Sequence, residues 1–212
     1  MVTKRALSSL FVLALSSGMV VAQNAGLKIA HTTHSGPIKA APTNLGQLLF
    51  SNLAPPPAAA YNDTTGYYVL GPTNSVGLSE QWIAVPFIPK RNAHVNLLQL
   101  AVQWISGTNT INVGLYSDNG GVVGSPLAVT SAPVTSTFGT CCQLVNASIA
   151  STAVTRGTQY WIVASSDDVN APDFTGVFDA SATEIIGADV SVTGWFSFTT
   201  LTPAAAAWGT IP

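Results

Sequence analysis

Charged side chains are scarce, because only 8% of the 212 residues are Asp, Glu, Lys or Arg, against roughly 25% in an average soluble domain. Seven Lys and Arg residues are too few to neutralise many phosphates, which argues against nucleic-acid binding. The same scarcity argues against a coiled coil or helical bundle, whose exposed faces need Glu, Lys and Arg. An apolar share of 47% excludes a charge-driven disordered chain. Polarity comes instead from 20 Ser and 23 Thr.

Motifs for hydrolysis are also lacking. Gly-x-Ser-x-Gly is absent, and His94 is the only histidine after residue 43. Glycoside hydrolysis needs two carboxyl groups about 5–9 Å apart. Glu80 and Glu184, the only glutamates, belong to no recognisable motif, although a pair formed in space stays open. We therefore expect a protein that is not an enzyme, and a small secreted glycoside hydrolase is the weakest alternative.

The only cysteines, Cys141 and Cys142, are adjacent. They cannot bridge two distant strands to each other, so three states stay open in an oxidising compartment: a vicinal disulfide, free thiols or pairing between chains. We favour the vicinal disulfide, which closes a small ring and contributes little through loop entropy. A redox or zinc role is disfavoured, because no spacer separates the thiols and no further ligands stand near.

The first 22 residues have the pattern of a secretory signal peptide. Lys4 and Arg5 precede an apolar stretch, and Val20 and Ala22 occupy the −3 and −1 positions of a small-residue cleavage site before Gln23. An uncleaved membrane anchor is the alternative. No later segment has the roughly 18 apolar residues that a membrane span needs. We therefore expect secretion or display at the cell surface, and a mature chain with five cations, nine anions and a net charge of −4.

Residues 23–43 show no sustained periodicity and are predicted to form a flexible leader with solvated histidines at His31 and His34. The domain proper is predicted over 44–212, where β-rich runs alternate with Gly, Pro, Asn and Ser clusters. In 94–105, apolar residues recur at every second position, which predicts a strand with one buried face. We expect 94–105 and 111–115 to form an antiparallel hairpin around Gly107. The fold class is therefore predicted as all-β, an antiparallel β-sandwich of jelly-roll type.

Three stretches resemble the bacterial secreted domains called choice-of-anchor, especially the R-type group. They are Val-Gly-Leu-Tyr-Ser-Asp at 113–118 running on to Gly-Ser-Pro-Leu at 124–127, Gly-Thr-Gln-Tyr-Trp-Ile-Val at 157–163, and the closing segment 203–209. The resemblance covers roughly 45–212 and implies an exported β-sandwich joined to varied surface-sorting tails, without an established enzyme activity. This chain ends at Pro212 with no hydrophobic helix, basic tail or sortase-like motif, so free secretion is expected.

Two sets of residues are candidates for ligand binding. Flat rings pack against the C–H faces of sugars, and the rings predicted to do so are Trp82, Tyr116, Trp161 and Trp195. Tyr160 and Trp161 are consecutive in a strand and face opposite sides, so two arrangements stay open: at least one ring is outside, or the core and the loops cover both sides. Calcium prefers six to eight oxygen ligands. A loop rich in such oxygens contains Asp167, Asp168, Asn170 and Asp173, although a solvated turn explains the same residues.

The sequence thus predicts a non-catalytic secreted or cell-surface module with a structural, matrix or adhesion role. A carbohydrate-binding module, with calcium as its one candidate cofactor, is the alternative. The partners we expect are an extracellular glycan or a component of the cell surface or matrix.

Overall fold

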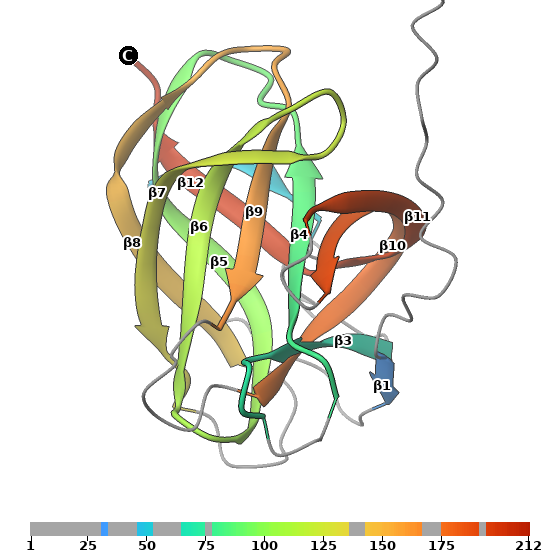
Figure 1. Ribbon diagram of the computed structural model, residues 1–212. Coiled ribbons are helices and arrows are strands. Elements are labelled where there is room, and N and C mark those ends of the chain that lie inside the picture. Colours follow the sequence, from blue (N-terminus) through green and yellow to red (C-terminus); the bar gives the residue numbers. More distant parts are fainter. Residues whose placement is uncertain are drawn as a thin grey trace, which may run out of the picture.

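The computed structural model describes residues 31–33, 46–52, 65–74, 78–135, 143–166, 175–190 and 194–212. All regular structure in these ranges is β, and none of their residues forms a helix long and apolar enough to cross a membrane (Figure 1). The predicted all-β class is confirmed. The strands are β1 (His31–Thr33), β2 (Gln47–Ser51), β3 (Thr65–Leu70), β4 (Gln81–Phe87), β5 (Ala93–Ser106), β6 (Thr110–Asp118), β7 (Val123–Pro133), β8 (Gln143–Val154), β9 (Tyr160–Ser165), β10 (Thr175–Val190), β11 (Phe196–Pro203) and β12 (Ala205–Thr210).

Eight strands form two antiparallel sheets that pack face to face. One sheet has the order β2-β12-β5-β8, and the other has the order β4-β9-β6-β7. Apart from the β6–β7 hairpin, consecutive members of this set alternate between the sheets. Four strands in each sheet with these connections make a jelly roll. The predicted jelly-roll sandwich is therefore confirmed.

The remaining strands lie at one side of the sandwich, beside β4 (Figure 1). The first part of β10 pairs with β3 and with the end of β5, and its last residues pair with β4. This long strand therefore connects the two sheets along that side. β11 pairs with β10, and β1 pairs with β3. Three residues of the predicted leader, His31–Thr33, thus belong to the sheet. The rest of 23–43 lies outside the described residues, so the flexible leader stays a prediction.

The predicted hairpin of 94–105 with 111–115 is wrong. β5 lies between β12 and β8, whereas β6 lies between β9 and β7 in the other sheet. The chain crosses between sheets at Gly107, whose φ of 78° favours glycine. Inward side chains of the two strands share one core, in which Leu98 and Leu100 of β5 are buried together with Val113 and Leu115 of β6. Strands that face each other across a core show the same apolar alternation as strands that pair.

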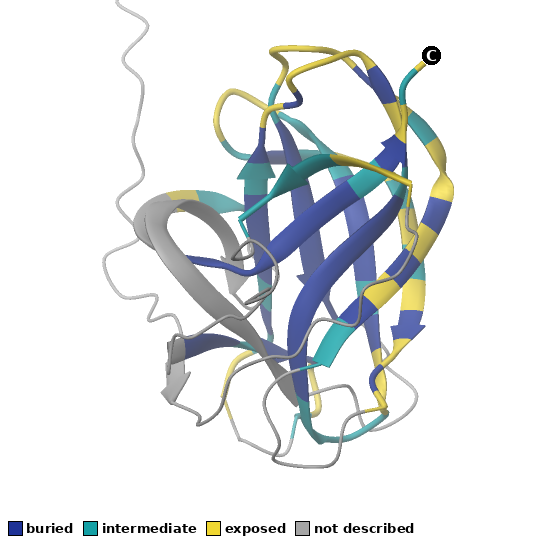
Figure 2. Cartoon of the chain, turned by 180° about the vertical axis from the view of Figure 1, so that it is seen from behind, coloured by how far each residue is buried: buried dark blue, intermediate teal, exposed yellow. Residues whose placement is uncertain are grey.

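The central part of β5 is buried on both faces, not on one as predicted (Figure 2). Leu98 and Leu100 face the main core, and on the other face Gln99 and Gln103 are only 4% and 6% exposed. The buried Gln99 amide accepts a hydrogen bond from Trp208 Nε1 (2.9 Å) and donates to Asn146 Oδ1 (2.8 Å). Neighbouring strands therefore supply the partners that a buried polar side chain needs.

Candidate functional site

Four aromatic side chains come together on the outer face of the β4-β9-β6 part of the second sheet. Successive strand residues point to opposite faces. Ala84, Val163 and Gly114 are paired across these strands, as are Tyr116 and Trp161, so all of them share the outer face. Neighbours such as Ile83 and Ile162 point inward to the main core. We call the group that gathers on this outer face the aromatic cluster, and its members are Trp82, Tyr116, Trp161 and Trp195.

Trp195 contacts both Trp82 and Tyr116 and packs over the outer face of the sheet. It immediately precedes β11, and its ring centroid lies 6.3 Å from that of Trp82 and 6.5 Å from that of Tyr116. The interplanar angles of 53° and 63° are tilted and edge-to-face arrangements, which favour aromatic pairs electrostatically. Trp161 lies beneath, fully buried with Ala84 and other apolar side chains of the sheet face. The rings thus form a small second core outside the sandwich.

Gly114 allows the Tyr116 ring to lie close to the sheet. A Cβ atom built at Gly114 would be 2.5 Å from Cε2 of Tyr116 and 3.0 Å from Cγ2 of Val129. Any larger residue at this position would displace the tyrosine ring, so a glycine in the middle of β6 is a condition for the cluster.

Two indole N–H groups of the cluster, those of Trp82 and Trp161, have hydrogen-bond partners. Trp82 Nε1 donates to Glu80 Oε1 (3.1 Å) and to the Ser166 carbonyl oxygen (3.3 Å). Trp161 Nε1 donates to Asp118 Oδ1 (2.8 Å). A buried tryptophan usually finds such a partner, because its N–H would otherwise be desolvated without compensation.

Asp118 holds this end of the cluster in place. Besides Trp161, its carboxylate accepts from Gln159 Nε2 (2.7 Å) and from the backbone N–H of Gly121 (3.0 Å). Burial alone would raise the pKa of Asp118, but the hydrogen bonds from Gly121, Trp161, Gln159 and Gly120 together outweigh burial and lower the pKa. The group is therefore an ionised acceptor at neutral pH.

The predicted ring residues thus converge, but they are not equally open to solvent. Of the two arrangements left open for Tyr160 and Trp161, the covered one is found, because Tyr160 is 9% exposed and Trp161 is 0% exposed. Tyr160 faces the main core, and its hydroxyl accepts from the Thr155 N–H (3.0 Å). A fully buried ring cannot stack on a ligand at the surface, so Trp161 supports the others. Ring surface is available from Trp82, Tyr116 and Trp195, which are half-buried.

The other predicted site residues lie outside the described ranges. These residues are Cys141, Cys142, Asp167, Asp168, Asn170 and Asp173. Within the part of the chain that the structure describes, no group of three or more His, Cys, Asp or Glu is placed to hold a metal ion. The vicinal disulfide and the calcium loop therefore stay predictions.

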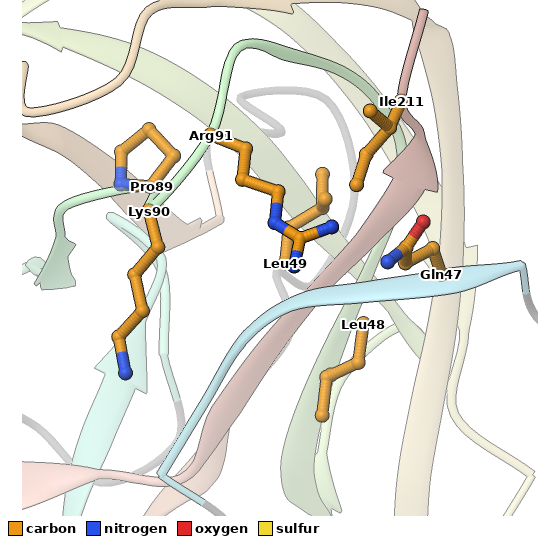
Figure 3. A pocket seen from close by; sticks show the side chains of 7 residues that line it. All are labelled: Gln47, Leu48, Leu49, Pro89, Lys90, Arg91 and Ile211. Atoms are coloured by element: carbon orange, nitrogen blue, oxygen red, sulfur yellow. The ribbon is translucent and has the colours of Figure 1, made fainter.

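Sequence reasoning missed a surface cavity of about 200 Å³ at the end of the sandwich where β2 begins. It lies between β2, the β4–β5 turn and the residue after β12 (Figure 3). A sequence signal did exist: Lys90 and Arg91 are the only adjacent cations after the predicted signal peptide. The lining residues are Gln47, Leu48, Leu49, Pro89, Lys90, Arg91 and Ile211.

Comparisons with protein-family models, curated proteins and solved structures found no match for this chain. The resemblance to choice-of-anchor domains therefore stays a prediction from the quoted residues. The aromatic cluster, the carboxylates and the cavity are the features of the molecule that bear on its function.

Proposed function

We propose that this chain is a non-catalytic, secreted or cell-surface β-sandwich module with a structural, matrix or adhesion role. The observation that carries the proposal is the role of the two acidic side chains that the structure describes, Glu80 and Asp118, as hydrogen-bond acceptors within the aromatic cluster. Both accept hydrogen bonds from indole N–H groups of the aromatic cluster. A general acid must hold a proton near the working pH. The lowered pKa of Asp118 is the opposite of that requirement, and its hydrogen-bond donors keep it in a supporting role.

The outer surface of β7 and β8 also supports this role. Neither strand contains a charged residue, and their exposed positions carry hydroxyl, amide and small apolar groups. Leu127 and Val129 of β7 are 44% and 49% exposed. An uncharged surface of this kind suits contact with neutral extracellular material and avoids long-range attraction to charged macromolecules.

Localisation and activity measured together test the proposal. When the full chain is expressed in a bacterial host with a general export pathway, we expect it in the medium or at the cell surface. We expect no release of sugar from glycoside substrates above the level of a Glu80→Gln, Glu184→Gln double variant. Retention in the cytoplasm, or hydrolysis that the double variant abolishes, would contradict the proposal.

A carbohydrate-binding role is the second candidate, and the aromatic cluster favours it. Trp195 and the two half-buried rings whose centroids lie within 6.5 Å of it, Trp82 and Tyr116, offer apolar faces beside the polar groups of Glu80 and Ser166. Such a combination matches the C–H faces and hydroxyl groups of a sugar.

A glycan array with matched variants tests this second role. We expect Trp195→Leu to weaken the binding of a neutral glycan about tenfold or more, the scale of losing an aromatic contact. Trp104→Leu is the control, because Trp104 is also half-buried but packs against the main core. A folded wild type that binds no glycan on the array, with or without millimolar calcium, would overturn the carbohydrate-binding role.

A further inference from the structure

The cavity beside β2 is bordered by two cations from one turn. Lys90 and Arg91 lie in the β4–β5 connection, and Gln47 and Leu49 come from β2. In Figure 3 the Arg91 side chain extends toward Leu49 and Gln47. The Lys90 side chain extends in another direction, away from Arg91. The two charges therefore border the cavity from different directions. We call this site the cationic cavity.

The charges of the cationic cavity are not neutralised within the described part of the chain. None of the lining residues is acidic, and neither Lys90 nor Arg91 has an ion-pair partner among the described residues. The third cation of the described ranges, Arg156, lies in an adjoining loop: its backbone N–H donates to Asn92 Oδ1 (2.8 Å), and the next N–H donates to the Pro89 carbonyl (3.0 Å). The three cations that the structure describes, Lys90, Arg91 and Arg156, thus lie at the same end of the sandwich, and their positive charge attracts anions to that end.

The remaining lining sets the size and character of the ligand. Gln47 offers an amide that donates and accepts hydrogen bonds, while Leu49, Pro89 and Ile211 offer apolar surface. A volume of about 200 Å³ is below the roughly 300–1,000 Å³ of sites for drug-sized ligands. The cavity therefore suits one small ring that carries an anionic group, hydroxyl groups and C–H faces.

We propose that the cationic cavity binds a single carboxylate-bearing sugar unit, a uronate, of an extracellular polysaccharide. Arg91 is suited to the carboxylate, because a guanidinium makes paired hydrogen bonds to both of its oxygens, and Lys90 adds a second charge. Gln47 is placed for the ring hydroxyls, and Leu49 and Ile211 for the C–H face. The extracellular source of the sugar rests on the proposed function, whereas anion binding does not.

Titration of the purified full chain with sodium glucuronate, followed by backbone amide NMR shifts, tests the proposal. We expect the amide signals of Gln47, Leu49 and Arg91 to shift. The dissociation constant for glucuronate should be at least about tenfold lower than that for glucose, because hydrogen bonds to a charged group are worth that factor. Arg91→Gln should weaken glucuronate binding about tenfold or more, by the same reasoning. Arg156→Gln is the matched control, because it removes a cation at the same end but outside the lining, and it should change binding less than about twofold.

The following results would overturn the proposal. Equal weakening by Arg156→Gln would show a general charge effect without a site. Glucuronate binding no tighter than glucose would remove the role of the carboxylate. Sulfate or a glutamate-rich peptide binding more tightly than glucuronate would identify an inorganic anion or an acidic peptide as the ligand class. If the protein is exported and non-hydrolytic but does not bind glucuronate, the uronate proposal fails and the proposed function stands. If the protein binds glucuronate but stays inside the cell, only the proposed function is contradicted.

Discussion

At the scale of single residues, Asp118 shows how a short-range network supports the candidate site. One carboxylate at the end of β6 accepts from Trp161, from Gln159 and from the turn that follows. It joins the buried base of the aromatic cluster to the β6–β7 and β8–β9 loops. Its hydrogen-bonded donors favour the ionised form, so its contribution to stability depends on pH.

The Asp118→Asn variant should be less stable than the wild type at pH 7 by about 1–3 kcal/mol, because an amide replaces an acceptor of charge-assisted bonds. The folded-state pKa of Asp118 is lowered, so its stabilisation is present above the unfolded pKa of about 3.9 and is lost as pH falls through the folded value. The difference should therefore shrink at pH 2.5. Urea unfolding at both pH values measures it, and a difference that does not change with pH would contradict this role.

Gly209 is a second residue on which local structure depends. A Cβ atom there would overlap the carbonyl oxygen of His94 on the neighbouring strand, and a backbone atom cannot move aside as a flexible side chain can. We expect Gly209→Ala to lower the free energy of unfolding by about 1–3 kcal/mol, the usual cost of overpacking. Thr210→Ala, at the exposed next position, is the control and should change stability by less than about 0.5 kcal/mol. Thermal unfolding of the two variants compares them, and equal losses would contradict the close approach.

At the scale of elements, position in the sheet separates the strands. β9 lies between β4 and β6, and all six of its residues are buried. β5 is paired along both sides and buried on both faces through its centre. β2 and β7 are edge strands of the two sheets of the jelly roll, and both carry exposed residues. Opening a central strand disrupts two neighbours, whereas an edge strand can detach by local unfolding.

Amide hydrogen exchange should therefore be slowest in β9 and in the central part of β5, with protection close to that of global unfolding. Amides of β2 and β7 should exchange faster through local opening. Peptide-resolved exchange followed by mass spectrometry measures both groups in one sample. Protection of β7 beyond that of β9 would show that the sheet order does not determine local stability.

At the scale of the whole molecule, the low share of charged residues and the predicted export signal are the basis of the proposed extracellular setting. The intact mass of the exported protein should lack residues 1–22 and should be lower by two hydrogens at Cys141 and Cys142. Alkylation without and with prior reduction checks the second point, because a vicinal disulfide leaves no thiol to react. Thiols that react without reduction would reject the vicinal bond, and a mass that includes Met1 would reject cleavage of the signal peptide.

Local patterns in the sequence were sufficient to predict the all-β class and the inward face of β6. Alternation with a period of two and frequent turn residues are properties of a few neighbouring residues, so they can be recognised without the fold. The four rings of the aromatic cluster were also predicted, because the tryptophan and tyrosine residues of a small β-sandwich are few.

Strand partners, burial and the cationic cavity were decided only by the tertiary structure. The alternation in β5 and β6 is equally compatible with pairing and with facing across a core, and long-range packing chose the second arrangement. Trp161 is buried because Trp195, more than thirty residues later, packs against the cluster above it. The cationic cavity joins Gln47, Arg91 and Ile211, which become neighbours only when β12 inserts between β2 and β5. Contacts at such separations depend on the closed sandwich, which no local pattern specifies.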